Sequence, residues 1–367
     1  MVKHQSLRGA GCPYGTHRVL EPQGVLPQAA WRVDPADEIY DNEILVDVHT
    51  LNIDAASFKQ LVEAARKDFR EKGKPQPSRL ELEEAVAASI MDIVARRGKM
   101  HNPVTGSGGM LLGTIARFGD KVRGREGAKE GDLIATQASL SLTPLKLSAV
   151  HKVYLDKDQV DVEGTAVIFE TAPFAVIPPD IDRRLALAVL DVAGAPVQTE
   201  RLVREGQSVL VLGAGGKSGL ICMYVAGEKV GSTGKVIGLA HSETSLRRAR
   251  ALGDRYVIVQ GDAGDAIGTM RKVMEANGGE KVDVTINCVN VPGTEMASIL
   301  CTKERGKVYF FSMATSFTAA ALGAEGVAAD VDLIIGNGYA AGHSRAALEL
   351  VRRAPALRRV LEEMFLR

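Results

Sequence analysis

The chain has 367 residues, of which 46% are hydrophobic and 25% charged; this is typical of a soluble globular protein that is long enough for two domains. Its 45 basic residues balance 45 acidic ones, which argues against nucleic acid or a membrane surface as a partner, because both attract a dense positive field. The opening residues 1–11 lack the apolar stretch of a secretory signal. Four scattered cysteines without a C-x-x-C pair favour reduced thiols and a cytoplasmic location.

The first half of the chain is predicted to be β-rich. Residues 43–50 alternate apolar and polar side chains, as a half-buried strand does. Further short strands are predicted at residues 114–117 and 133–136, and the glycine-rich turns between them are typical of a partly open barrel. The composition changes at the Pro-Pro-Asp of residues 178–180. We therefore expect a β-rich substrate domain over residues 1–177.

A helical insertion is predicted within this domain, over residues 58–100. The segment is charged and has apolar residues at helical spacing. Residues 74–77, with two prolines, divide it into two helices, and Ser78 is a suitable N-cap for the second. We interpret the insertion as a solvated excursion without a catalytic role.

In residues 178–367, strand and helix patterns alternate, which predicts βαβ units and a doubly wound parallel sheet, the Rossmann fold. The strands are continuous apolar runs, as expected when helices cover both faces of the sheet. The predicted strands are residues 208–212, 235–240, 256–259, 282–288, 307–312 and 332–335. The helices between them include residues 218–230 and 243–252.

A glycine-rich segment follows the first of these strands immediately. Gly213, Gly216 and Gly219 form G-x-x-G-x-x-G between a buried strand and a helix, which favours dinucleotide binding. The first glycine permits the tight turn, the second lets the backbone approach a pyrophosphate, and the third allows close helix packing. Amide groups at the helix N-terminus would bind the phosphates. The predicted contacts are Gly213, Gly215, Gly216, Lys217, Ser218 and Gly219.

Two other interpretations of this loop are weaker. Gly216, Lys217 and Ser218 resemble the end of a P-loop, but that motif needs a glycine five positions earlier, where this chain has Val211. The second alternative is a purely structural turn. Cofactor choice depends on the end of the second strand, where an acid would bind the ribose of NAD. His241 and Ser242 stand there, and the acid Glu243 follows slightly late for the ribose, so NAD is favoured. NADP stays open, because Ser242 and an arginine, Arg247 or Arg248, could accept its 2′-phosphate.

Several segments resemble the medium-chain dehydrogenase/reductase superfamily. They are residues 43–54, 185–195, 204–219, 282–289 and 333–338. Where zinc-dependent members place their catalytic ligands, this chain has Ile53, Asp54 and residues 106–109, and the cysteines of a structural zinc lobe are missing. Zinc needs four suitable ligands at defined spacing. We therefore expect no metal.

A closer resemblance is to the L-erythro-3,5-diaminohexanoate dehydrogenase family. Its members are zinc-free enzymes that act in lysine fermentation, a form of amino acid degradation. The strings that show it are residues 12–18, 24–28, 98–110, 139–144, 287–292, 310–318 and 321–326. The resemblance implies a diamino acid substrate, oxidised by NAD or NADP to 5-amino-3-oxohexanoate and ammonium. The nicotinamide would accept the hydride, and the protein must orient and deprotonate the amine.

Candidate catalytic residues follow from this resemblance. Asp54 is the first choice for the base or for the partner of an ammonium group, with helix capping as the alternative role. Glu325 is a second acid, expected on a loop. Arg18 is the leading cation for the substrate carboxylate, since guanidinium binds carboxylates in a bidentate fork. His17 is a candidate proton shuttle, and Ser57 could orient the nicotinamide or a water molecule.

The cofactor is expected to meet further residues at the ends of the parallel strands. Those predicted are His241, Ser242, Asn287, Val289, Asn290 and Ser312. Lys99 is a reserve cation for the substrate.

Two other functions compete with the amine dehydrogenase. A zinc-free quinone or enone reductase of the same fold would need an apolar, aromatic pocket, and only 5% of the chain is aromatic. A non-catalytic NADPH-binding homologue would bind cofactor without turnover. For assembly, we predict a homodimer through edge pairing of residues 333–338.

Overall fold

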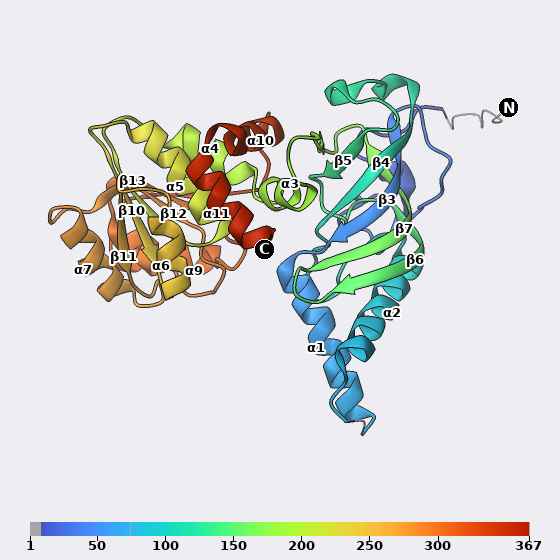
Figure 1. Cartoon of the computed structure of the whole chain (residues 1–367), viewed down its shortest axis with the longest axis horizontal. Coiled ribbons are helices and arrows are strands. Elements are labelled where there is room, and N and C mark those ends of the chain that lie inside the picture. Colours follow the sequence, from blue (N-terminus) through green and yellow to red (C-terminus); the bar gives the residue numbers. More distant parts are fainter. Residues whose placement is uncertain (1–8, 74, 367) are drawn as a thin grey trace. The chain divides into compact units, whose positions relative to one another are not determined.

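The computed structural model describes residues 9–73 and 75–366. Most of residues 1–11, which were predicted to lack a secretory signal, therefore lie outside the described residues. Two compact units make up the chain, one ending at Ile181 and the other beginning at Asp182 (Figure 1). This division falls a few residues after the composition change at residues 178–180. Among the described residues, no helix is both long enough and apolar enough to cross a membrane.

The N-terminal unit contains a six-stranded antiparallel sheet with the order β6-β7-β3-β4-β5-β8. A two-stranded sheet of β1 (Val19–Glu21) and β2 (Arg32–Val33) precedes it. The six strands are β3 (Glu43–Asn52), β4 (Met110–Phe118), β5 (Leu133–Thr136), β6 (Leu145–Tyr154), β7 (Gln159–Phe169) and β8 (Phe174–Val176). The three strands predicted in this half are thus confirmed, and the long hairpin of β6 and β7 was not predicted.

Two helices, α1 (Ala55–Glu71) and α2 (Arg79–Arg97), form the insertion between β3 and β4. The predicted N-cap is confirmed, because Ser78 and Glu81 form a capping box at the start of α2. Lys74, in the predicted break, lies outside the described residues. The interpretation as a solvated excursion holds only for the outer faces of the helices, which are exposed. Apolar side chains of both helices, including Phe58 and Ile90, belong to the same buried cluster as the sheet.

The C-terminal unit is a parallel six-stranded sheet with the order β11-β10-β9-β12-β13-β14. Its strands are β9 (Ser208–Leu212), β10 (Lys235–Ala240), β11 (Tyr256–Gln260), β12 (Val282–Asn287), β13 (Thr302–Phe310) and β14 (Asp332–Ile335). All six predicted strands are confirmed, although β13 begins five residues before the prediction. The chain reverses its direction of progress between β9 and β12, which is where doubly wound sheets bind their ligands.

Helices connect these strands. They are α3 (Arg183–Leu190), α4 (Gly194–Leu202), α5 (Lys217–Val230), α6 (Glu243–Arg250), α7 (Ala266–Ala276), α8 (Glu295–Cys301), α9 (Phe317–Gly326), α10 (His343–Arg353) and α11 (Pro355–Phe365). The central strand β9 is almost wholly buried, which explains its continuous apolar run. The mixed α/β architecture therefore agrees with the fold class that the sequence predicts.

Candidate active site

The glycine-rich turn after β9 has a geometry that requires glycine at three positions, Gly213, Gly215 and Gly219. Gly213 has a φ of +79°, which L side chains rarely adopt. Its amide donates to the carbonyl oxygen of Leu239 over 3.1 Å. A Cβ on Gly219 would lie 2.1 Å from the Gly213 carbonyl oxygen. The third glycine of the motif therefore lets α5 begin close against β9, as the fingerprint demands.

The middle glycine faces more open space. A Cβ on Gly216 would meet only the Gly213 carbonyl oxygen, at 3.4 Å, an ordinary contact. Gly216 is the N-cap of α5 and provides no side-chain cap, so the first amide groups of this helix are available for an anion. Gly215 packs against α6, since its Cβ would lie 2.3 Å from the Ser245 carbonyl oxygen. The turn thus fits a dinucleotide pyrophosphate.

Lys217, the first residue of α5, is partly neutralised. Its Nζ lies 2.5 Å from Asp191 Oδ2 and 5.8 Å from the ring centre of Phe365. These contacts occupy the Lys217 side chain within the C-terminal unit, so the turn would hold phosphates mainly through backbone amides.

The loop after β12 lies beside the turn. Gly213 approaches the Cys288 carbonyl and the amide of Val289, and Asn290 is exposed. The Asn287 side chain does not face this opening. Its Nδ2 donates to Thr294 Oγ1 and Ser298 Oγ, and its Oδ1 accepts from the Val289 amide. The Asn287 side chain therefore shapes the loop from behind, and the predicted contact of this residue with the cofactor stays a prediction.

The neighbouring strand ends complete this edge of the sheet. Ser312 follows β13, and its amide donates to the Asn287 carbonyl oxygen. His241 is exposed after β10. Ser242 is occupied as the N-cap of α6, because its Oγ accepts from the Ser245 amide. No acid stands at the end of β10 itself, and Glu243 is exposed in the first turn of α6.

In the N-terminal unit, Asp54 follows the end of β3, and its two carboxylate oxygens have different surroundings. Its Oδ1 accepts from the Ser57 amide over 2.9 Å and caps α1. Its Oδ2 is buried and has no hydrogen-bond partner among the described residues. The two roles considered for Asp54 are thus compatible, because capping uses one oxygen and leaves the other for a ligand.

A loop over residues 102–109 packs against this strand end. Ser57 is fully buried, and its Oγ lies 2.5 Å from Thr105 Oγ1. Asn102 is also fully buried, and its Oδ1 accepts hydrogen bonds from the amides of Val104 and Thr105. A Cβ on Gly109 would lie 2.1 Å from the Asn52 carbonyl oxygen, so this close approach needs glycine. Asp54, Ser57 and the loop form one structured site.

Arg18 and His17 do not lie at the end of β3 with Asp54; both contact Glu43, at the start of this strand. Arg18 is fully buried, and five hydrogen bonds use its five N–H groups: two go to Glu43 and three to the carbonyl oxygens of residues 34, 36 and 38. His17 accepts from the Cys12 amide and donates to Glu43. Neither ring nitrogen is left for a proton shuttle.

The position of Glu43 explains why this pair is not part of the same site. Glu43 begins β3, whereas Asp54 follows its end, and a strand of this length spans roughly 30 Å. Burial raises the pKa of Glu43, but hydrogen bonds from His17 and Arg18 outweigh it and hold that pKa below its ordinary value. The predicted roles of Arg18 and His17 were wrong, because both residues anchor the N-terminal segment to the sheet.

Three basic residues, Arg97, Lys99 and His101, alternate across the C-terminal end of α2. Gly98, with a φ of +66°, ends the helix, and its missing Cβ would lie 2.1 Å from the Val33 carbonyl oxygen. Arg97 donates to the His101 carbonyl oxygen and to His101 Nδ1. Lys99 is fully buried, and its Nζ donates to the Pro27 carbonyl oxygen over 2.6 Å. Burial and the charge of Arg97 lower the pKa of Lys99 to about 8.

Glu325 lies in the last turn of α9 and not on a loop; the sequence did not predict this helix. Its side chain is exposed. No group of three or more His, Cys, Asp or Glu residues within residues 9–73 and 75–366 is arranged to hold a metal ion.

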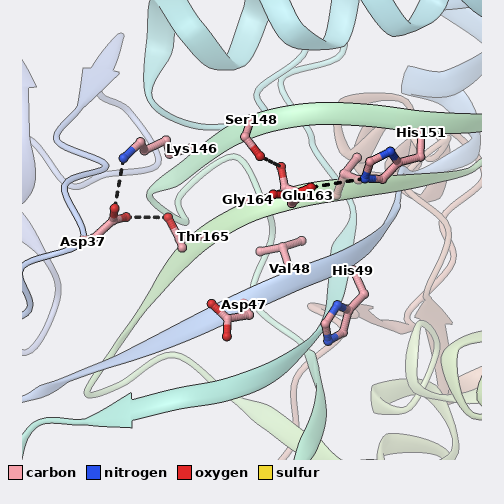
Figure 2. Close-up of a pocket in the computed structure, with 11 residues that line it drawn as sticks. Asp37, Asp47, Val48, His49, Lys146, Ser148, His151, Glu163, Gly164 and Thr165 are labelled. Atoms are coloured by element: carbon pink, nitrogen blue, oxygen red, sulfur yellow. Dashed lines mark hydrogen bonds and ion pairs between the residues drawn. The ribbon is translucent and has the colours of Figure 1, made fainter. Parts of the chain in front are cut away.

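A groove of about 540 Å³ lies on the open face of the sheet, over β3, β6 and β7. Figure 2 shows that its charged groups largely pair with one another: Asp37 with Lys146 and Thr165, and Glu163 with His151. These pairs satisfy the side chains internally. The end of β3 is the stronger candidate, because there a buried carboxylate oxygen stays unpaired.

Comparison with known proteins identifies the family. Residues 17–178 match the model of the L-erythro-3,5-diaminohexanoate dehydrogenase N-terminal domain. The chain is 49% identical over 356 residues to the L-erythro-3,5-diaminohexanoate dehydrogenase of Fusobacterium nucleatum, which covers 97% of this chain and 99% of that protein. The chain belongs to the L-erythro-3,5-diaminohexanoate dehydrogenase family. A relative of that name in Acetoanaerobium sticklandii is 48% identical, with the same coverage.

The fold of this family member is also similar to that of a mycobacterial protein in complex with NADPH. The TM-score is 0.54 at 15% sequence identity, and the alignment covers 88% of each chain. At this identity the likeness concerns the fold alone, which is the one that the sequence predicts.

Two of the strings by which the sequence resembles the L-erythro-3,5-diaminohexanoate dehydrogenase family converge near the end of β3. Residues 98–110 supply Lys99, Asn102 and the loop beside Asp54, and the carbonyl groups that accept from Lys99 belong to residues 24–28. The basic cluster that these strings form was not predicted from the sequence. The alternation Arg97-x-Lys99-x-His101 was the signal that could have revealed it.

Proposed function

We propose that this chain oxidatively deaminates L-erythro-3,5-diaminohexanoate to 5-amino-3-oxohexanoate and ammonium, with NAD(P)+ as hydride acceptor. The observation that supports this most strongly is the identity of 49% over nearly the whole length of a relative with that activity in its name. A complete glycine-rich turn and an unpaired carboxylate oxygen at the end of β3 are consistent with it.

The cofactor would be held at the carboxyl ends of β9, β10, β12 and β13. Gly213, Gly216 and Gly219 would shape the turn, and the amides at the start of α5 would bind the pyrophosphate. Val289 and Ser312, which follow β12 and β13, are proposed contacts of the nicotinamide half. When bound, the nicotinamide ring supplies the hydride acceptor. NAD is favoured over NADP because the first turn of α6 presents Glu243, and an acid there repels a 2′-phosphate.

Asp54 is the proposed base. A substrate ammonium must lose a proton before hydride can leave the carbon that bears it. Oδ2 of Asp54 is the unpaired atom that can accept this proton, while Oδ1 stays bound to the Ser57 amide. Loss of the hydride leaves an iminium, to which water adds, and ammonium then departs from the resulting carbinolamine. Glu325 remains a candidate partner for the second ammonium group.

The proposal includes a homodimer and a cytoplasmic location. β14 is an edge strand of the parallel sheet, and exposed apolar side chains lie on it and on α9: Ile335 is 57% exposed and Leu322 63%. An unpaired edge with apolar neighbours favours pairing with a second copy. The four cysteines are free thiols, in keeping with a reducing compartment.

The test is reduction of NAD+ by purified protein with L-erythro-3,5-diaminohexanoate, compared with oxidation of NADPH in the presence of a quinone. Substrate-dependent formation of NADH without quinone reduction supports the proposal. Quinone reduction with no amine oxidation would transfer the function to the reductase alternative. Cofactor binding without either reaction would favour a non-catalytic homologue.

A further inference from the structure

Among the described residues, no acidic side chain pairs with the basic cluster of Arg97, Lys99 and His101, whose hydrogen bonds go to backbone carbonyls and to one another. The charged groups that shift the pKa values of these three residues are all basic. Burying charges without a counterion is costly. Elsewhere in this unit the chain avoids that cost, since Arg18 is paired with Glu43. A concentrated positive charge without an acid is therefore a feature that an anionic ligand would stabilise.

The hydrogen bonds define how the cluster presents its donors. Arg97 Nη2 faces His101 Nδ1 at 3.2 Å, and a guanidinium can only donate. His101 therefore carries its proton on Nε2. Burial, together with the charges of Lys99 and Arg97, lowers the pKa of His101 to about 4, so the ring is neutral near pH 7. Its Nε2–H has no acceptor among the described residues.

This donor faces the loop that also contacts the end of β3. A Cβ on Gly106 would lie 4.0 Å from His101 Nε2, and Gly106 is the next residue after Thr105, which contacts Ser57. The same loop thus lies between the basic cluster and the segment that begins with Asp54. One side offers hydrogen-bond donors and positive charge, and the other offers a carboxylate oxygen. A substrate with an ammonium and a carboxylate group matches this arrangement.

We propose that Arg97 and His101, with the buried ammonium of Lys99 beside them, form the subsite that binds the carboxylate of the substrate. Arg97 and the Nε2–H of His101 donate to the carboxylate, and both side chains are partly exposed. Lys99 is fully buried and contributes its charge without direct contact. This inference rests on the proposed function for the identity of the substrate, and it assigns to these residues the role that Arg18 does not fill.

The experiment measures binding without turnover. Calorimetry with NADH present compares 3-aminobutyrate, a β-amino acid, with 3-aminobutyramide, an isostere in which an uncharged amide replaces the carboxylate. In the unaltered protein, 3-aminobutyrate should bind about 10- to 100-fold more tightly, as expected for a hydrogen-bonded charge. This comparison needs no variant, so it stands even where a substitution prevents folding. Equal affinities would overturn the subsite.

Two variants locate the effect. Arg97→Gln should weaken 3-aminobutyrate by about 10- to 100-fold and leave 3-aminobutyramide unchanged. Arg96→Gln is the matched control, because it removes the same charge from a neighbouring, exposed side chain that pairs with Asp92; it should change neither affinity by more than about twofold. An equal loss for both ligands in Arg97→Gln would show a merely structural role and overturn the proposal.

The outcomes separate this inference from the proposed function. If 3-aminobutyrate is preferred but L-erythro-3,5-diaminohexanoate is not oxidised, the subsite stands and the proposed reaction falls. If the diamino acid is oxidised while the amide binds as tightly as the acid, the reaction stands and the subsite falls.

Discussion

Replacing Glu43 by glutamine tests the structural role assigned to the Arg18 cluster. Four donors converge on this carboxylate: His17 Nε2 and Arg18 Nε on Oε1, and Arg18 Nη2 and the Tyr40 amide on Oε2. A glutamine keeps one oxygen and turns an NH2 group toward the other two donors. Those two donors then lose their acceptor, at about 1–3 kcal/mol each, and the buried guanidinium loses its counterion. Glu43→Gln should therefore destabilise the N-terminal unit by about 3–5 kcal/mol.

The assay is urea unfolding followed by the fluorescence of Trp31, the one tryptophan of the chain, which reports on the N-terminal unit. Asp68→Asn is the control: it breaks an exposed pair with Lys72 and should cost no more than about 1 kcal/mol. Below the transition, folded Glu43→Gln should keep the affinity of the wild type for substrate. A stable variant with weakened substrate binding would refute the reasoning and return Arg18 to the substrate site.

The pH dependence of the same difference has a definite sign. The pKa of Glu43 is lower in the folded chain than its ordinary value, so its contribution is present above the unfolded pKa of about 4.3. It is lost as the pH falls through the folded pKa. The gap in stability between wild type and Glu43→Gln should therefore be constant near neutrality and shrink in acid, as measured by urea unfolding at a series of pH values.

Three further predictions concern the cofactor turn, the base and the dimer. Gly216→Ala should fold normally, because its Cβ makes only an ordinary contact, yet weaken NADH in a fluorescence titration by at least tenfold, whereas Gly326→Ala, in open space, should not; equal affinities would exclude a pyrophosphate at Gly216. Asp54→Asn keeps the cap on α1, so its melting temperature should hold while kcat falls about 10²- to 10⁴-fold; unchanged kcat would remove Asp54 as base. Ile335→Lys should convert a dimer to a monomer in light scattering, and a variant that stays dimeric would place the interface elsewhere.

The parallel sheet could be predicted closely because its signal is local. β9, β10 and β14 match the predicted bounds to the residue, since strands covered on both faces are continuous apolar runs that end at turns. The hairpin of β6 and β7 gave no such signal. Its register shifts twice along the ladder, and β6 mixes exposed and half-buried positions, so neither alternation nor a continuous apolar run marks it.

The candidate site was predictable where a role depends on position along the chain, and not where it depends on a distant partner. Asp54 could be placed from its position after a strand, and Gly213 and Gly219 from their spacing. Arg18 could not, because its partner Glu43 is 25 residues away and nothing in the sequence announces the pair. Its buried ion pair with Glu43 removes the cation that was predicted to bind the substrate carboxylate.

The most direct test of the central claim is to measure NADH and ammonium in the same sample during reaction with L-erythro-3,5-diaminohexanoate. Oxidative deamination predicts one ammonium for each NADH formed, at a rate that Asp54→Asn reduces without changing that ratio. NADH without ammonium would show an oxidation that leaves the amine in place. A flat trace from folded, NADH-binding protein would contradict the account as a whole.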